Sequence, residues 1–159
     1  MIKRMILIST ISAALIVIFA GCKKNLKDFS FSYSMESMGS YKTTFSIDSD
    51  KNYKIETHNY FMDNRSAKRA PIIKEGTLTD EEYETMKKML EKCNFFKMKD
   101  SYGFEEEPSD STADIMYQIQ FQTSGKTKYI SFRNTDKTKF PASFVKLISH
   151  IGTFMSNQS

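Results

Sequence analysis

Apolar and polar residues alternate strictly along the segment that begins at Phe29. From Phe29 to Met35, every second residue is apolar, and the residues between them are Ser30, Ser32 and Ser34. A period of two places alternate side chains on opposite faces of a β-strand. Similar alternation recurs over 41–48 and 53–61, with turn-forming residues before each segment. The pattern therefore predicts a meander of three antiparallel strands, with the serines on its solvent side.

The clearest local signal is the start of a helix after Thr79. Thr79 and Glu82 have capping-box spacing, in which each side chain accepts a hydrogen bond from the backbone N–H of the other. Leu78 and Tyr83 occupy the positions of a hydrophobic staple. We expect a helix from Asp80 to about Lys92. Its apolar face comprises Tyr83, Met86, Leu90 and Cys93.

The other segments predict further strands and a second helix. A short strand is expected at 72–78, and the alternating segment 115–122 forms a hairpin with 126–133. Pro141 suits the first turn of a last helix. The apolar stripe of that helix comprises Phe144, Leu147, Ile148, Ile151 and Met155. The order β-β-β-(β)-α-β-β-α predicts an α+β fold, with an antiparallel sheet of about five to six strands covered by two helices.

A different pattern occupies the first 22 residues. Lys3 and Arg4 precede an apolar run over 6–19, which only three hydroxyl residues interrupt. A basic start followed by an apolar segment is typical of a secretory signal peptide. The run ends at Ala20, Gly21 and Cys22. The two small residues suit an extended peptide in a peptidase cleft, and Cys22 supplies a thiol.

The string from Phe19 to Cys22 resembles the lipobox of bacterial lipoproteins. The resemblance implies that residues 1–21 are removed, that Cys22 receives a diacylglyceryl group, and that its new amino group is often acylated too. The alternative is an ordinary signal peptide or an uncleaved anchor, since a bilayer span needs about 20 residues. The lysines within 23–27 outnumber the cations before the apolar run, which opposes the orientation of such an anchor.

Lipidation of Cys22 would divide the chain into a tether over 22–28, one domain over 29–156 and a tail over 157–159. The tether spans at most about 20 Å at roughly 3.3 Å per residue, so the domain would work close to the membrane. Lys23 stands where enterobacterial lipoproteins retained in the inner membrane have an aspartate. We therefore expect a cell-envelope protein that faces the periplasm from the outer membrane in a Gram-negative host, or lies on the outer leaflet in a monoderm host.

The charge balance argues against binding to nucleic acid. The formal net charge is +4 at pH 7, with 23 basic and 19 acidic residues. Without Lys3 and Arg4, which belong to the signal segment, 21 basic residues face the same 19 acidic ones. Nucleic-acid-binding domains usually carry a basic stripe, whereas lysine and glutamate are mixed along this chain. DNA and RNA are therefore not expected as partners.

Cys93 is the thiol that remains once Cys22 is acylated. A nucleophilic cysteine needs a base close to it. Periodicity places His58 with Lys54 and Glu56 on the polar face of a strand, whereas Cys93 lies on the apolar face of a helix. We therefore interpret Cys93 as a core residue, and no catalytic residue is predicted.

Acidic residues gather in the segment 105–114. They are Glu105, Glu106, Glu107, Asp110 and Asp114. Their spacing is not that of a calcium-binding EF-hand, and the cysteines and histidines lack zinc-site spacing. We therefore predict no metal or cofactor and interpret the segment as a solvated loop. The alternative is an envelope hydrolase or a calcium-dependent enzyme that uses these carboxylates.

Arg65, Lys68 and Arg69 form a short basic loop that is a candidate binding site for a phosphate, a carboxylate on a glycan or a lipid headgroup. Gly-rich phosphate loops, nucleophile elbows and HExxH motifs are absent from the sequence. Our preferred hypothesis is a non-catalytic binding module of the cell envelope, with a protein or a glycan as its partner.

Four features of the domain together resemble uncharacterised lipoprotein domains of Bacteroidetes-type bacteria. They are the leading hairpin, the GTLTDEE helix entry at 76–82, the ADIMYQIQF strand at 113–121 and the final helix that Pro141 introduces. The resemblance implies a fold and a compartment, and it implies no activity.

Overall fold

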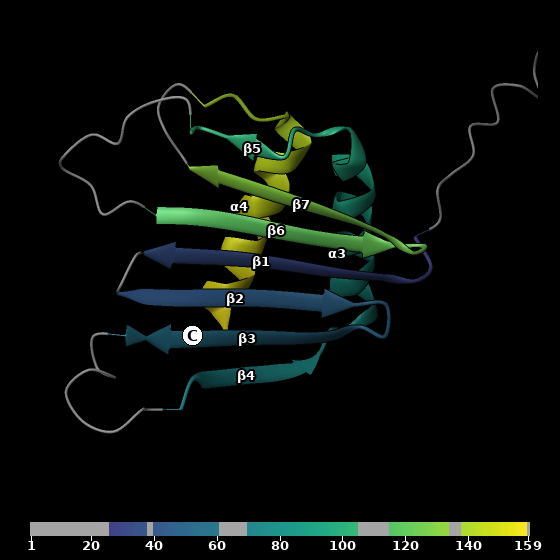
Figure 1. Cartoon of the computed structure of the whole chain (residues 1–159). Coiled ribbons are helices and arrows are strands. Elements are labelled where there is room, and N and C mark those ends of the chain that lie inside the picture. The colour runs from purple at the N-terminus through teal and green to yellow at the C-terminus, as the bar shows by residue number, and fades with distance from the viewer. Residues whose placement is uncertain (1–25, 38–39, 61–69, 105–114, 134–137, 159) are drawn as a thin grey trace, which may run out of the picture.

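The computed structural model describes residues 26–37, 40–60, 70–104, 115–133 and 138–158. Within these residues, one seven-stranded sheet carries both long helices on the same face (Figure 1). The α+β class predicted from the sequence is confirmed. The described elements are β1 (Phe29–Ser37), β2 (Tyr41–Asp48), β3 (Asn52–Asn59), β4 (Ile72–Thr77), α3 (Asp80–Cys93), the 3-10 helix η1 (Phe95–Lys97), β5 (Ser101–Tyr102), β6 (Ile115–Thr123), β7 (Lys126–Arg133) and α4 (Ala142–Asn157).

The strands lie in the order β4-β3-β2-β1-β6-β7-β5. The central strand β1 pairs antiparallel with β2 on one side and β6 on the other. The predicted purely antiparallel sheet of five to six strands is wrong in one respect, because β5 adds a strand that runs parallel to β7. With two residues, β5 is too short to show any periodicity. Just before this strand, Asp100 O accepts a backbone hydrogen bond of 2.9 Å from Ser131 N in β7.

The core lies between the sheet and the two helices. Residues directly opposite one another in neighbouring strands point to the same face. Phe31 is opposite Ile47 in β2 and Phe121 in β6, so the buried alternate positions of the three strands form one apolar layer. Burial of this layer removes apolar surface from water, which is the main favourable contribution to folding.

Helix α3 begins where the capping box predicts. Glu82 N donates to Thr79 Oγ1 at 3.3 Å, and Thr79 N donates to Glu82 Oε2 at 2.9 Å. The Tyr83 ring stacks on Phe29 with 6.2 Å between centroids, which joins the first turn of the helix to the start of β1. The helix ends at Cys93, and Asn94 takes a left-handed conformation with φ 48°. The predicted apolar face of this helix is buried in full.

Helix α4 crosses the sheet from β7 to β3. Near its start, Phe144 contacts Phe132 with ring centroids 5.3 Å apart, and near its end Phe154 contacts Tyr53 at 5.1 Å. The buried stripe is Phe144, Leu147, Ile151 and Phe154.

Two details of the α4 prediction differ from the structure. Pro141 precedes the helix as its N-cap, with ψ 139°, instead of belonging to the first turn. Phe154 takes the buried place expected for Met155, because its ring fits between Phe45 and Tyr53, whereas Ile148 and Met155 are half-buried at the edge of the core.

The described chain packs against the core from Leu26, before the expected domain start at Phe29. The Leu26 side chain is half-buried against the core, and Leu26 N donates to Glu91 Oε1 on α3 at 3.2 Å. At the other end of the meander, β3 stops at Asn59, short of the expected position 61. In the described part of the chain, neither helix has the length and apolar content needed to cross a membrane.

Candidate functional site

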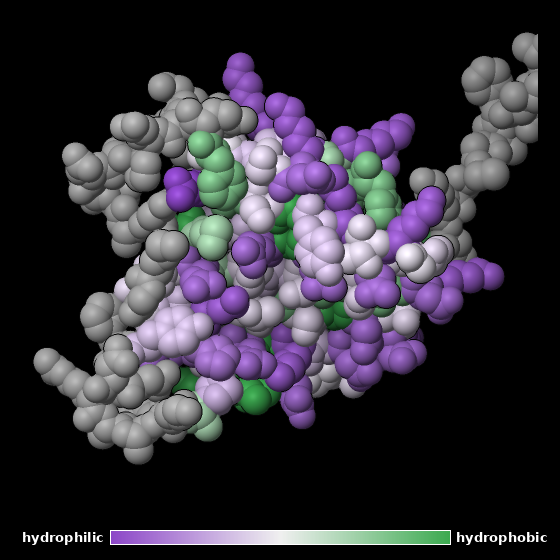
Figure 2. Space-filling view, in the orientation of Figure 1, coloured by the Kyte–Doolittle hydropathy of each residue, from purple (hydrophilic) through white to green (hydrophobic). Residues whose placement is uncertain are grey.

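The face of the sheet opposite α3 and α4, which we call the open face, is covered by neither helix (Figure 1). The alternation that buries one set of side chains points the other set toward this face. Across the strands these side chains form rows, because paired residues point the same way. One long row crosses from β4 to β7. It comprises Glu75, Lys54, Ser46, Ser32, Gln120 and Tyr129. Figure 2 shows that polar side chains predominate on this face.

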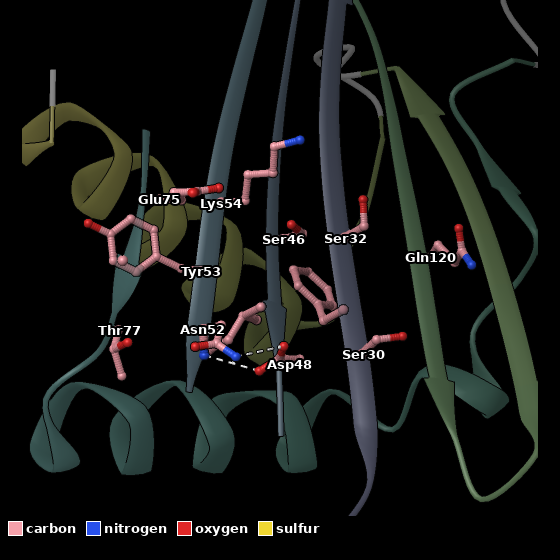
Figure 3. Close-up of a pocket in the computed structure, with 13 residues that line it drawn as sticks. Ser30, Ser32, Ser46, Asp48, Asn52, Tyr53, Lys54, Glu75, Thr77 and Gln120 are labelled. Carbon is pink, nitrogen blue, oxygen red and sulfur yellow. Dashed lines mark hydrogen bonds between the residues drawn. The ribbon is translucent and has the colours of Figure 1, made fainter. Parts of the chain in front are cut away.

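The open face is hollowed over its central strands. A depression of about 680 Å³ lies over β1, β2 and β3 and reaches β4 and β6 (Figure 3). Serines at the centre of the long row have short side chains, so the surface is lower there than at Lys54 or Gln120. A second hollow of about 190 Å³ adjoins the first, and the two share Ser32 and Gln120 among their lining residues.

The three serines of β1 lie on the open face, as the alternation predicts. Ser30 is exposed and Ser32 is half-buried, whereas Ser34 is only 8 % exposed. The sequence predicts that these serines form the solvent side of the sheet. They line the two hollows, with Ser32 in both.

Charged groups on the open face are largely paired with one another. Lys54 Nζ lies 2.6 Å from Glu56 Oε2, and His58 Nε2 lies 2.8 Å from Glu56 Oε1. The hydrogen bonds from Lys54 and then from His58 hold the pKa of Glu56 below its usual value. Nearby, Lys42 pairs with Glu36 at 3.2 Å. These pairs keep the face polar without giving it a strong field of either sign.

Asp48, at the edge of the larger hollow, has a structural role. Its Oδ1 accepts a hydrogen bond from Asp50 N at 2.9 Å. Oδ1 also accepts one from Asn52 N at 3.0 Å, and Oδ2 accepts one from Asn52 Nδ2 at 3.3 Å (Figure 3). An aspartate that holds successive backbone N–H groups stabilises a tight turn. Asp48 therefore supports the turn between β2 and β3.

Cys93 lies in the core, as predicted from its place on the helix. Its side chain is 3 % exposed, and the thiol donates to Ser143 O at 3.4 Å. Burial raises the pKa of Cys93 to about 11, so the reactive thiolate is disfavoured at neutral pH. The sheet separates this thiol from His58, which lies on the open face. The described residues also include no group of three or more His, Cys, Asp or Glu side chains arranged to hold a metal ion.

Several predicted site residues lie outside the described part of the chain. They are Cys22, the basic residues Arg65, Lys68 and Arg69, and the acidic segment 105–114. For these residues the lipid anchor, the basic binding site and the calcium alternative stay predictions from sequence.

Sequence reasoning missed Gln120 and Tyr129 as candidate site residues. Both occupy polar positions of alternating strands, a signal that the sequence does contain. What periodicity does not show is that they lie in one row with Ser32, because that depends on the strand order and register.

Comparisons with protein-family models and with curated proteins found no match to this chain. Function must therefore be inferred from the residues and their geometry.

Proposed function

We propose that this protein is a membrane-anchored lipoprotein of the cell envelope, and that its domain is a non-catalytic binding module with the open face as its binding surface. The observation that carries the proposal is the hollowed polar face that neither helix covers. A depression of about 680 Å³ lies in the size range of ligand sites, about 300–1,000 Å³.

The anchor is supported by the sequence up to Cys22. Because the chain already packs against α3 at Leu26, the free tether would comprise only the residues between Cys22 and Leu26. Such a segment reaches at most about 13 Å at roughly 3.3 Å per residue. A diacylglyceryl group with a further acyl chain anchors a protein stably. The domain would therefore stay next to the lipid surface.

The point of attachment leaves the open face accessible. Leu26 and Phe29 lie beside α3, at the end of the sheet where β1 begins. A tether at that position would place the end of the sheet where β1 begins next to the membrane. The open face would then not be turned toward the membrane. The hollows would then face the space beside the protein, where a protein or glycan of the envelope can reach them.

A binding role is favoured over catalysis by the partners of the ionisable groups. On the open face, Glu56 is held by Lys54 and His58, and Asp48 by the turn that it stabilises. Catalytic acids and bases generally show pKa values moved toward neutrality. Here the pKa of Glu56 is lowered, so this carboxylate is a poorer base than an ordinary glutamate.

Fatty-acid labelling tests the anchor. Cells that express the full chain or Cys22→Ser are grown with a labelled fatty acid, and the purified proteins are compared. We expect label on the first protein only and loss of the variant from the membrane fraction. Label that persists on Cys22→Ser would contradict the anchor.

Site-specific photocrosslinking tests the binding surface. A photoreactive residue is placed at Gln120 on the open face or, as the control, at Val145, which is 51 % exposed on α4. We expect a defined adduct in intact envelopes from position 120 and none from 145. A Ser32→Trp change places a bulky ring where the two hollows meet and should abolish the adduct. Equal adducts at both positions would exclude the open face as the binding surface.

A further inference from the structure

We infer that the open face binds an uncharged oligosaccharide, which lies across the strands along the row from Lys54 to Tyr129 and stacks one sugar ring on Tyr129. This inference rests on the proposed function and deepens it, because it names the class of ligand. Four properties of the row support it: its continuity, its hydrogen-bonding chemistry, its exposed aromatic ring and its charge.

The two hollows form a continuous trough. The larger hollow includes Lys54, Ser46 and Ser32, and the smaller one includes Ser32, Gln120 and Tyr129. Each residue is the direct cross-strand partner of the next. Four strand spacings of about 4.8 Å separate Lys54 from Tyr129, so the trough is about 19 Å long. That length suits a chain of several sugar units better than a single ring.

The trough offers hydrogen-bonding groups of two kinds. A serine hydroxyl both donates and accepts, and a glutamine amide has a donor and an acceptor end. Ser46, Ser32 and Gln120 therefore present mixed donors and acceptors along the floor. Sugar hydroxyls have the same double capacity, so a polyhydroxylated ligand can satisfy these groups along the whole row.

Tyr129 supplies the one aromatic ring of this row, and it is 62 % exposed. The exposed ring offers a flat apolar face beside a polar hollow. The negative π face of the ring attracts the slightly positive C–H groups on one side of a sugar ring. The neighbouring Gln120 can then bond the hydroxyls at the rim of that sugar.

The composition of the trough disfavours a protein partner. Protein interfaces have an apolar, often aromatic centre surrounded by a polar rim. In the trough the arrangement is the opposite, because polar serines occupy its centre. Ile73 and Tyr129, two large exposed hydrophobic side chains of the open face, belong to β4 and β7, and β3, β2, β1 and β6 lie between them.

The charges of the trough favour a neutral glycan over an acidic one. Among the residues that line the two hollows, Lys54 is the cation, and Asp48 and Glu75 are carboxylates. Lys54 is already paired with Glu56. A sulfated or carboxylated sugar would therefore lose its hydration without gaining a strong counter-charge.

The inference is tested by titrating the full-length protein in detergent with defined tetrasaccharides. The neutral probes are cellotetraose, maltotetraose and the tetramer of N-acetylglucosamine, and the acidic probe is a sulfated heparin tetrasaccharide. Binding is followed by isothermal calorimetry. We expect saturable binding of at least one neutral probe, and binding of the sulfated probe at least tenfold weaker. Failure of all neutral probes to bind overturns the inference.

Matched variants locate the binding. Tyr129→Ala should weaken the affinity roughly fivefold to tenfold, as expected for loss of one aromatic contact. Tyr129→Phe keeps the ring and should bind within about twofold of the original protein. Val145→Ala, on the outer side of α4, should not change the affinity. Unchanged affinity in Tyr129→Ala, with circular dichroism showing intact folding, overturns the stacking assignment.

The same experiments separate this inference from the proposed function. One outcome is a peptide or protein adduct at position 120 that Ser32→Trp abolishes, together with no binding of neutral sugars. That outcome overturns the inference of a glycan ligand and supports the proposed binding module. Absence of both adduct and sugar binding overturns the two proposals together. Lipid labelling is independent of both results, because it reports on Cys22.

Discussion

At the scale of single residues, burial governs the reactivity of Cys93. Its thiol lies between α3 and the start of α4, with a pKa raised to about 11 by desolvation. In Cys22→Ser, Cys93 is the only thiol of the chain. We expect this variant to react with a thiol reagent at least about 100-fold more slowly in native buffer than in denaturant. The rates are measured from the absorbance of the released group. Equal rates in the two conditions would contradict the burial of the Cys93 thiol.

The same thiol predicts a dependence of stability on alkaline pH. Its pKa is near 9 when exposed and about 11 when folded, so the folded state favours the protonated form. The contribution to stability is complete below about pH 9 and is lost as pH rises toward 11. Burial also raises the pKa of Tyr33, which acts in the same direction. Urea unfolding between pH 8 and pH 11 should show that the free energy of unfolding falls as pH rises, and that it falls less in Cys93→Ala. An equal fall in both proteins would show that Cys93 does not cause the pH dependence.

At the scale of elements, the start of α3 depends on one hydroxyl. Thr79→Ala removes the acceptor for Glu82 N and should lower the free energy of unfolding by about 1 kcal/mol. Thr79→Ser keeps the hydroxyl and serves as the control, with a change within about 0.5 kcal/mol. Chemical denaturation measures both. Equal losses in the two variants would show that the threonine methyl, and not the cap, is responsible.

Two glycines give opposite predictions for the same substitution. Gly125 has φ +73° in the turn between β6 and β7, where a side chain strains the backbone, so Gly125→Ala should destabilise the protein by about 1 kcal/mol. Gly152 lies inside α4, and a Cβ there meets no atom within 4 Å, so Gly152→Ala should stabilise it by up to about 1 kcal/mol. The melting temperatures of the two variants are compared by thermal unfolding. Shifts of the same sign in both variants would contradict the opposite roles given to the two glycines.

At the scale of the whole molecule, one core joins the sheet to both helices. Leu147 is fully buried at the middle of α4, and Leu147→Ala should lower the free energy of unfolding by about 2–5 kcal/mol. Because the helices share this core, far-ultraviolet circular dichroism and tyrosine fluorescence should report one coincident transition. Val145→Ala, on the exposed side of the same helix, is the control. Separate transitions would indicate that α4 unfolds independently of the sheet.

The sequence by itself determined the local elements and their inner and outer faces. Strict alternation in β1 and the capping box of α3 are local signals, since each depends on neighbours within a few residues. The buried face of α3 could therefore be predicted residue by residue. In β1 the same holds for Phe29, Phe31 and Tyr33, whereas Met35 is only half-buried and Ser34, on the other face, is buried. The lipid anchor at Cys22 likewise follows from a contiguous stretch, and it stays a prediction.

Only the tertiary structure decided which strands are neighbours and what covers them. β5 is too short to have a period, and Phe154 is buried because Phe45 and Tyr53 meet it, although Met155 fits the helical stripe as well. The trough depends on the same kind of information. Ser32, Gln120 and Tyr129 lie far apart in the sequence and become neighbours only through pairing of β1 with β6 and β6 with β7. Periodicity assigns each side chain to a face, but long-range pairing and the placement of both helices on one side leave that face open.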